Sequence, residues 1–193
     1  MAKDTRAKMI EAAEKLFYRD GIRGVSVDAV AEAAGVTKRT LYYHFTSKDE
    51  LIAAYLDHRD QPNLARMRGW FEAADGSVAE RTRAIFQHLA KLMDHPAWRG
   101  CGFLRTAAEL ANMPGHPAIA IGRAHKLRFE DWLAGFYAQA GISDAGQLAR
   151  QIVLLVDGVH ASGLLHRDRA FALTAGEAAN ALVETALAKN IAN

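Results

Sequence analysis

The most informative segment of the chain runs from residue 25 to residue 51 and reads VSVDAVAEAAGVTKRTLYYHFTSKDEL. Its side chains include cations, hydroxyls and aromatic rings, and no carboxylate occurs between Ala33 and Ser47. Such groups can donate hydrogen bonds to phosphate oxygens and base edges without repelling a nucleic-acid backbone. The segment therefore predicts a surface that contacts the phosphates and bases of a nucleic acid.

A glycine turn divides this segment into two short helices, which is the layout of a helix-turn-helix. Gly35 can adopt the positive φ that lets two helices cross steeply with almost no loop between them. Leu41 and Phe45 are spaced i, i+4, so we expect them to pack with Val30 and Val36 into a small core. The opposite side of the second helix must then face outward.

That outward side supplies the candidate contact residues. Helical geometry turns Arg39, Tyr42 and Tyr43 outward, although a structural role for Tyr43 fits equally well. Thr37 and Ser26, at the starts of the two helices, can offer a hydroxyl and unpaired N–H groups to a phosphate. The predicted contact residues are Ser26, Thr37, Lys38, Arg39, Thr40, Tyr42, Tyr43, His44 and Lys48.

Other residue pairs with chemical potential give weaker signals. His88 and His95 are seven residues apart, and Asp157 and His160 are spaced i, i+3, so either pair could begin a metal site or an acid–base dyad. Solvated or core-edge histidines explain the same spacing. The sequence has no glycine-rich phosphate loop, HExxH or GxSxG motif, so we expect no catalytic residue, no metal and no cofactor.

Helical periodicity, which must position these residues, extends along the whole chain. In residues 5–19 the apolar side chains recur at i, i+3, i+4, i+7 and i+8, one face of an amphipathic helix. Similar patterns predict helices at 27–34, 38–45, 47–70, 78–93, 103–111, 117–140, 144–165 and 174–189. We therefore expect an all-α fold. Residues 1–47 would form a three-helix head with the helix-turn-helix, and residues 48–193 a helical body, joined by the helix from 48 to about 70.

The composition limits the class of protein. The chain has 193 residues, half of them hydrophobic, which indicates one folded domain, or a small module fused to a larger one, and excludes a disordered chain. The longest run of large aliphatic residues, Ile152 to Val156, is far shorter than the roughly 20 residues that span a bilayer. A charged N-terminal helix argues against secretion, and the single cysteine, Cys101, excludes an internal disulfide. We expect a soluble cytoplasmic protein that does not enter membranes.

The stretch GIRGVSVDAVAEAAGVTKRTLYYHFTSKDEL closely resembles the DNA-binding domain of TetR-family transcriptional regulators. The matching residues are Ala31, Ala34, Gly35, Val36, Thr37, Leu41, Tyr42, Tyr43, His44, Phe45, Lys48, Glu50 and Leu51. The likeness extends back through AAEKLFYRDG, and GCGFLRTAAEL and LLVDGVHASGLL more weakly resemble parts of the family's body. The resemblance implies a homodimer that binds a pseudo-palindromic DNA operator, usually as a repressor, and is released by a small molecule.

Residues 1–60 carry ten basic and ten acidic residues, so the expected DNA-binding head has no net charge. Nucleic-acid-binding domains more often have a basic excess. We therefore expect affinity to depend on a local cationic stripe, with a modest salt dependence set by the phosphates actually contacted.

The resemblance also implies roles for the body. It implies a pocket for a small, mostly apolar effector, with candidate residues Phe86, Leu89, Met93, Trp98, Cys101, Phe103, Leu104, His125, Phe129 and Trp132, although most of these must also serve as core. It favours a two-fold, four-helix dimer interface made by Ile152, Leu155, Val156, Val159, Gly163, Ala179, Leu182 and Ala186. A core role inside one subunit also fits these residues. Two reading helices on a dyad would meet half-sites about 34 Å apart.

Two other functions fit the sequence. An all-α enzyme or small-molecule carrier could keep a vestigial helix-turn-helix, and DNA binding upstream of the protein's own gene would argue against it. A regulator could also respond to a protein partner, for which a filled body core without a cavity would be the sign.

Overall fold

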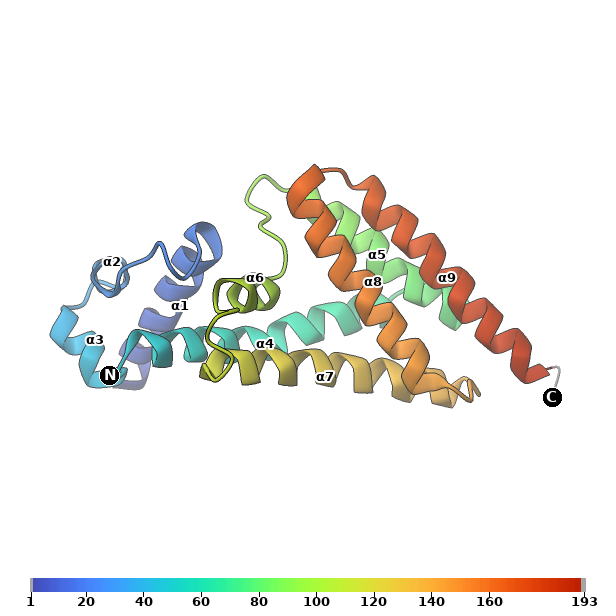
Figure 1. Cartoon of the computed structure of the whole chain (residues 1–193), viewed down its shortest axis with the longest axis horizontal. Coiled ribbons are helices and arrows are strands. Elements are labelled where there is room, and N and C mark those ends of the chain that lie inside the picture. The colour runs from blue at the N-terminus through green and yellow to red at the C-terminus, as the bar shows by residue number, and fades with distance from the viewer. Residues whose placement is uncertain (1, 192–193) are drawn as a thin grey trace. The chain divides into compact units, whose positions relative to one another are not determined.

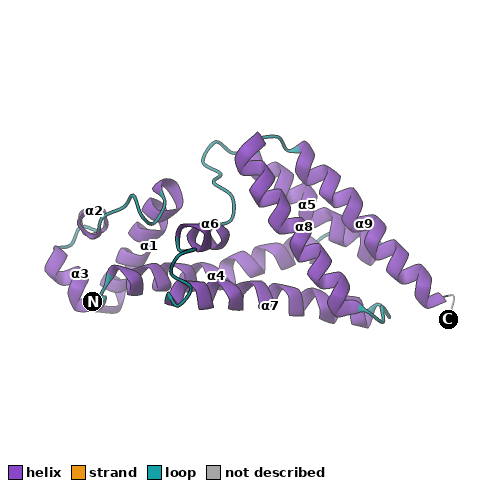
Figure 2. Cartoon of the chain, viewed as in Figure 1, coloured by secondary structure: helices purple, strands orange, loops and turns teal. Residues whose placement is uncertain are grey.

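The computed structural model describes residues 2–191, which fold into nine α-helices without a strand (Figures 1 and 2). The helices are α1 (Ala2–Asp20), α2 (Val27–Ala33), α3 (Lys38–His44), α4 (Lys48–Glu72), α5 (Val78–Met93), α6 (Gly102–Glu109), α7 (Pro117–Gln139), α8 (Ala145–His166) and α9 (Ala170–Ile191). The predicted all-α fold is confirmed. Most of the helix bounds lie within two or three residues of those that periodicity predicts.

The chain forms two compact units, and each is made from two separate stretches of sequence. Unit 1 contains the residues up to Pro62 together with 101–124, and unit 2 contains 63–100 together with the residues from His125 onward. The boundaries fall inside α4 and α7. The compact units thus differ from the predicted division after residue 47, because α6 and the start of α7 pack with the head.

The core of unit 1 explains the steep packing of its short helices. The stripe on α1 is buried, with Met9 at 0% and Phe17 at 3% exposure. Val30 of α2, Leu41 of α3 and Phe45, the residue after α3, are all at 0% exposure. These side chains belong to one hydrophobic cluster, as the i, i+4 spacing in α3 predicts.

Helix α6 is attached to the head through polar contacts that are distant in sequence. The Glu109 carboxylate accepts hydrogen bonds from the backbone N–H groups of Ile22 (3.2 Å) and Arg23 (2.9 Å), in the turn that follows α1. Arg105 donates to the carbonyl oxygen of Tyr18, at 2.6 Å. These bonds, together with the burial of Phe103 and Leu110 in the hydrophobic cluster of unit 1, hold α6 in that unit.

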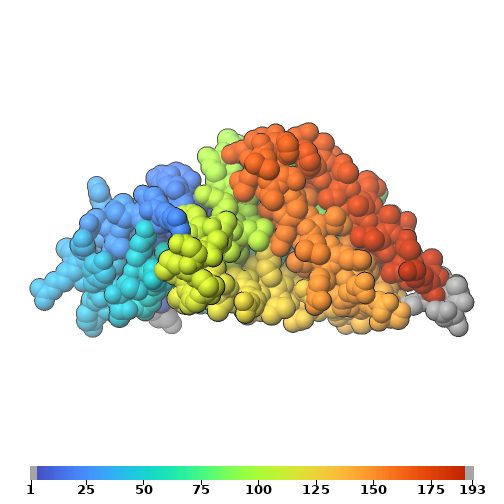
Figure 3. Space-filling view, in the orientation of Figure 1, coloured from blue at the N-terminus to red at the C-terminus, as the bar shows by residue number. Residues whose placement is uncertain are grey.

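Unit 2 is built around α5, whose start is fixed by a capping box between Ser77 and Glu80. The α5 side chains Ile85 and Phe86 are fully buried in the cluster that also takes in α8 and α9. The side chains of α8 and α9 pack side by side, as the space-filling view also shows in orange and red (Figure 3). Helix α9 begins four residues before the predicted Thr174, because the Asp168 carboxylate accepts a hydrogen bond from the N–H of Ala170 (2.8 Å).

Among the described helices, α8 has the length and apolar composition that would suffice to cross a membrane. Its Ile152, Val156 and Val159 are nevertheless buried in the core of unit 2. A core helix meets the same criterion of length and composition, so this feature is explained by packing within the chain.

Candidate nucleic-acid interface

The turn between α2 and α3 has the geometry that the sequence predicts. Gly35 adopts a φ of +68°, in the left-handed region that favours glycine. Thr37 then caps α3, with its side chain accepting the N–H of Thr40 at 3.1 Å. The two helices, of seven residues each, are thereby joined by residues 34–37 alone.

Helix α3 buries Leu41, leaves Thr40 and His44 half-buried, and exposes its other four residues. Arg39 is exposed, Tyr42 is 43% exposed and Tyr43 is 83% exposed. The exposure of Tyr43 argues against a role in the core, and its ring makes an edge contact with the half-buried His44 at 5.3 Å. An exposed strip of cationic, phenolic and imidazole groups is therefore held on a short, well-anchored helix.

The two N-caps keep donors available at the helix starts. Ser26 Oγ accepts the N–H of Ala29 at 3.1 Å, and the Thr37 hydroxyl lies 2.8 Å from that of Thr40. As an acceptor in its cap, the Ser26 hydroxyl keeps its own hydrogen to donate. The unpaired N–H groups and the positive end of each helix dipole favour a phosphate at these positions.

Lys38 does not stand alone at the start of α3. Its Nζ lies 3.0 Å from Oδ2 of Asp28 on α2, and both side chains are more than half exposed. The hydrogen bond and charge of Asp28 raise the pKa of Lys38 above its ordinary value. The absence of carboxylates between Ala33 and Ser47 therefore does not make this surface free of negative charge, because Asp28 of the preceding helix contacts Lys38.

Lys48 lies in the first turn of α4 and is half-buried. Burial lowers its pKa, while the charges of Glu109 and Asp49 act in the opposite direction. Asp49 in turn lies 3.3 Å from Nε2 of the buried His116, whose Nδ1 accepts the N–H of Ala118. Asp28, Asp49, Glu109 and His116 were missed by sequence reasoning, since no local spacing signals contacts between distant segments.

The predicted effector residues fall into both units. Phe86, Leu89, Met93, Trp98, His125, Phe129 and Trp132 lie in unit 2, whereas Cys101, Phe103 and Leu104 lie in unit 1. Most of the unit 2 residues are buried in its hydrophobic cluster, and the rings of Phe129 and Trp132 stack at 5.8 Å. The pocket itself stays a prediction.

The predicted interface residues also divide by exposure. Ile152, Val156, Val159, Gly163 and Ala179 are buried in the chain's own unit 2, and Leu155, Leu182 and Ala186 are half-buried. The exposed apolar residues on these helices are different ones. They include Leu154 (65%), Leu165 (80%) and Phe171 (40%).

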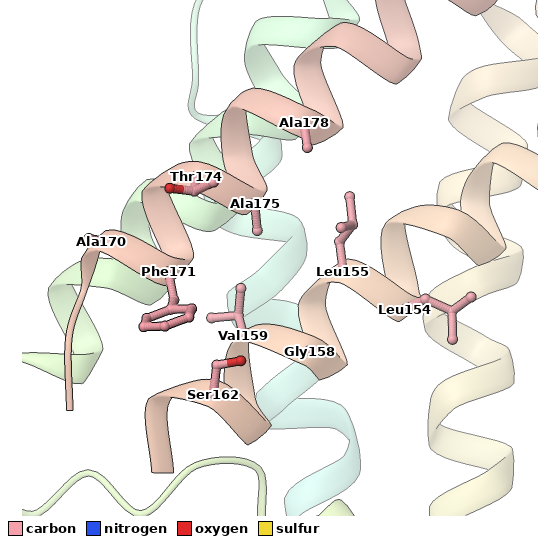
Figure 4. Close-up of a pocket in the computed structure, with 10 residues that line it drawn as sticks. All are labelled: Leu154, Leu155, Gly158, Val159, Ser162, Ala170, Phe171, Thr174, Ala175 and Ala178. Carbon is pink, nitrogen blue, oxygen red and sulfur yellow. The ribbon is translucent and has the colours of Figure 1, made fainter. Parts of the chain in front are cut away.

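The outer face of α8 and α9 contains an apolar groove of about 460 Å³ (Figure 4). Its lining residues are Leu154, Leu155, Gly158, Val159, Ser162, Ala170, Phe171, Thr174, Ala175 and Ala178. The close-up shows the Phe171 ring of α9 beside Val159 and Ser162 of α8, whereas Leu154 points away from this group. Small residues on both helices leave this face shallow and apolar.

The histidine and carboxylate pairs considered as catalytic or metal-binding are engaged elsewhere. Asp157 forms an ion pair with Lys126, and the His160 ring bonds the carbonyl oxygen of Val156 at 2.8 Å. His95 accepts the N–H of Ala97, and His88 stacks on Trp70 at 5.2 Å. Within residues 2–191 we find no group of three or more His, Cys, Asp or Glu side chains arranged to hold a metal.

A capped, exposed recognition helix placed after a glycine turn defines a DNA-binding protein of the helix-turn-helix class. Residues 9–55 match the family model described as bacterial regulatory proteins, tetR family. Over the full chain, the crystal structure of a TetR-family transcriptional regulator from Streptomyces coelicolor is 32% identical, with a TM-score of 0.78 and coverage of 97% of this chain and 96% of that one. The chain belongs to the TetR family of transcriptional regulators; it is a DNA-binding regulator and not an enzyme.

Other relatives agree with this membership. A TetR-type regulator from Streptomyces avermitilis is 34% identical with a TM-score of 0.82, covering 94% of this chain and 97% of that one. The transcriptional regulator TtgR of Pseudomonas putida is 46% identical over 67 residues, which are 34% of this chain and 32% of TtgR. The likeness to this curated relative thus spans about a third of its length.

Proposed function

We propose that this chain is a ligand-responsive repressor that acts in the cytoplasm, binds a palindromic operator as a homodimer and is released by a small, mostly apolar effector. The observation that carries the proposal is the exposed polar and aromatic strip of α3, fixed from beneath by the buried Leu41. A helix of this diameter fits the major groove of B-DNA.

The contact residues divide into two chemical roles. Arg39 and Tyr42 project from the exposed side of α3 and would read base edges, since the guanidinium can bond guanine in a bidentate manner. Ser26, Thr37 and Lys48 would hold phosphates and so set the position of α3. Thr40, Tyr43 and His44 flank the base-reading residues, and Lys38 lies at the start of the same helix.

The dimer would form through the outer face of α8 and α9. We propose that the groove is covered by the same groove of a second copy, because a two-fold interface pairs a surface with itself. The exposed Leu154 and Phe171 at an apolar groove favour association, since contiguous exposed apolar patches commonly mark contact surfaces. In this arrangement Ile152, Val156 and Val159 support the interface from inside each subunit.

The effector would bind in unit 2, among the predicted residues that lie there. Apolar and aromatic side chains with one buried histidine, His125, suit a mostly apolar molecule that makes few hydrogen bonds. Operator and effector would oppose each other if they favour different conformations of the protein, and this coupling is reciprocal.

The DNA-binding surface is tested by replacing Arg39 and Tyr42 together with alanine. A mobility-shift assay with DNA from upstream of the protein's own gene should show that operator binding is lost, while helicity and oligomeric state are kept. Lys91→Ala, which removes an exposed cation from α5, is the control and should bind normally. Unchanged binding by the double variant would refute the assigned surface.

The dimer is tested by Leu154→Glu, which places a charge at the proposed interface. Sedimentation should show a monomer, whereas Leu127→Glu on α7, a similarly exposed leucine (48%), should leave a dimer. A Leu154→Glu variant that still sediments as a dimer would refute the α8–α9 interface.

A further inference from the structure

The ion pair between Asp28 and Lys38 is a puzzling feature of a DNA-binding surface. Lys38 is the first residue of α3, and Asp28 is the second residue of α2. The side chains are 57% and 62% exposed, yet they meet at 3.0 Å. A cation suited to a phosphate is therefore held by a carboxylate of the same head.

The position of Asp28 makes its charge relevant to DNA in a second way. It lies two residues after Ser26, one of the proposed phosphate contacts, within the first turn of α2. A carboxylate there repels the phosphate backbone. Both effects oppose the approach of DNA that makes only backbone contacts.

The pair is also weak enough to be broken. An exposed ion pair between flexible side chains contributes little free energy and is screened by salt. Because both side chains are largely exposed, little free energy of desolvation is involved when Lys38 leaves Asp28 and binds another anion. A phosphate presented at the right place by a fully seated α3 can therefore displace Asp28.

We propose that Asp28 is a specificity-determining residue, which withholds Lys38 from non-specific DNA and releases it to a phosphate when α3 is seated in its operator. The proposal rests on the proposed DNA-binding surface and assigns to Asp28 the control of one positive charge on that surface, Lys38. On non-specific DNA, Lys38 makes no phosphate contact; on the operator, it makes one.

Removing Asp28 should therefore strengthen non-specific binding. One additional phosphate contact steepens the slope of log K against log salt by about 0.9 for each head. Asp28→Asn should show this change on a random-sequence duplex. Its affinity for the operator should rise less, so the ratio of specific to non-specific binding should fall.

The experiment is a double-mutant cycle. Binding of Asp28→Asn, Lys38→Gln and the double variant is measured over a range of salt concentrations, on the random-sequence duplex and on the footprinted operator. If Asp28 acts through Lys38, the double variant should return to the wild-type slope on the random duplex. Glu32→Gln, which removes another exposed carboxylate from α2, controls for net charge, and Asp28→Ser with thermal melting controls for folding.

The outcomes separate this inference from the DNA-binding surface. If Lys38→Gln weakens operator binding but Asp28→Asn leaves the non-specific slope unchanged, the role of Asp28 is refuted while the surface stands. The role of Asp28 would also be refuted if Glu32→Gln, or the double variant that lacks Lys38, gained as much non-specific affinity as Asp28→Asn. Loss of any carboxylate would then explain the gain. If Lys38→Gln has no effect on the operator, the contact assigned to Lys38 is itself wrong.

Discussion

The attachment of α6 to the head makes a strong prediction about stability. In Glu109→Ala, the backbone N–H groups of Ile22 and Arg23 lose their shared acceptor. Glu109 lies in α6, whereas its partners lie in the turn after α1, 86 and 87 residues earlier in the chain. The variant therefore removes a link between distant segments of unit 1 without opening a large cavity.

The expected cost follows from the surroundings of the two donors. Ile22 is buried, so its N–H is left without a partner, which costs about 1.5 kcal/mol. Arg23 is exposed, so water can replace the carboxylate at a cost of about 0.5 kcal/mol. The total of about 2 kcal/mol corresponds to a decrease in Tm of about 4–8 °C for a chain of this size.

Urea unfolding and thermal melting followed by circular dichroism measure this change. Glu109→Gln keeps one neutral acceptor oxygen and should lose about half as much stability. Glu11→Ala, which removes an exposed carboxylate from α1, is the control and should melt within about 1 °C of the wild type. If Glu109→Ala melts with the control, the link is not stabilising and the reasoning from donor burial is wrong.

Two further predictions concern backbone conformation and pH. Gly35→Ala should lower the free energy of unfolding in urea by about 1 kcal/mol, because φ is +68° there, although a Cβ would meet no atom within 4 Å. Gly69→Ala has equal space but lies inside α4, so it should raise the free energy of unfolding by about 0.5–1 kcal/mol. Equal effects of the two substitutions would contradict the left-handed conformation assigned to Gly35. Burial, aided by the charges of Lys126 and Arg66, lowers the pKa of His160 from 6.5 to about 4. Between these two pH values His160 binds a proton in the unfolded chain but not in the folded one. Its contribution to the free energy of unfolding is therefore complete above pH 6.5, and about 3 kcal/mol is lost as the pH falls to 4 and below. His160→Gln should show a correspondingly smaller decrease, and a parallel decrease in both proteins would refute the role of His160.

The sequence predicts the short helices of the head well because their signals are local. The i, i+4 spacing of Leu41 and Phe45 determines which side of α3 is buried, and the other side is the exposed strip. The start of α5 is predicted correctly for the same reason, since Ser77 and Glu80 form their capping box within one turn.

Features that depend on distant segments are not predictable in this way. The Asp28–Lys38 pair forms across a turn, and hydrophobic periodicity does not predict the angle of that turn. The hydrogen bond between Glu109 and the N–H of Arg23 joins residues that are 86 positions apart in the sequence. The pattern on α8 is also ambiguous, because a repeat of Leu, Val and small residues suits a core and an interface equally. The burial of Ile152 beside the exposure of Leu154 separates these roles, and only the packed structure shows it.

The single buried side chain of α3 has a practical consequence for engineering. Because Leu41 is the one fully buried residue of this helix, the four exposed positions, Lys38, Arg39, Tyr42 and Tyr43, can be exchanged as a cassette without repacking the interior. Libraries that randomise those positions should yield mostly folded proteins. New operator preferences could then be selected on this scaffold with little loss of yield.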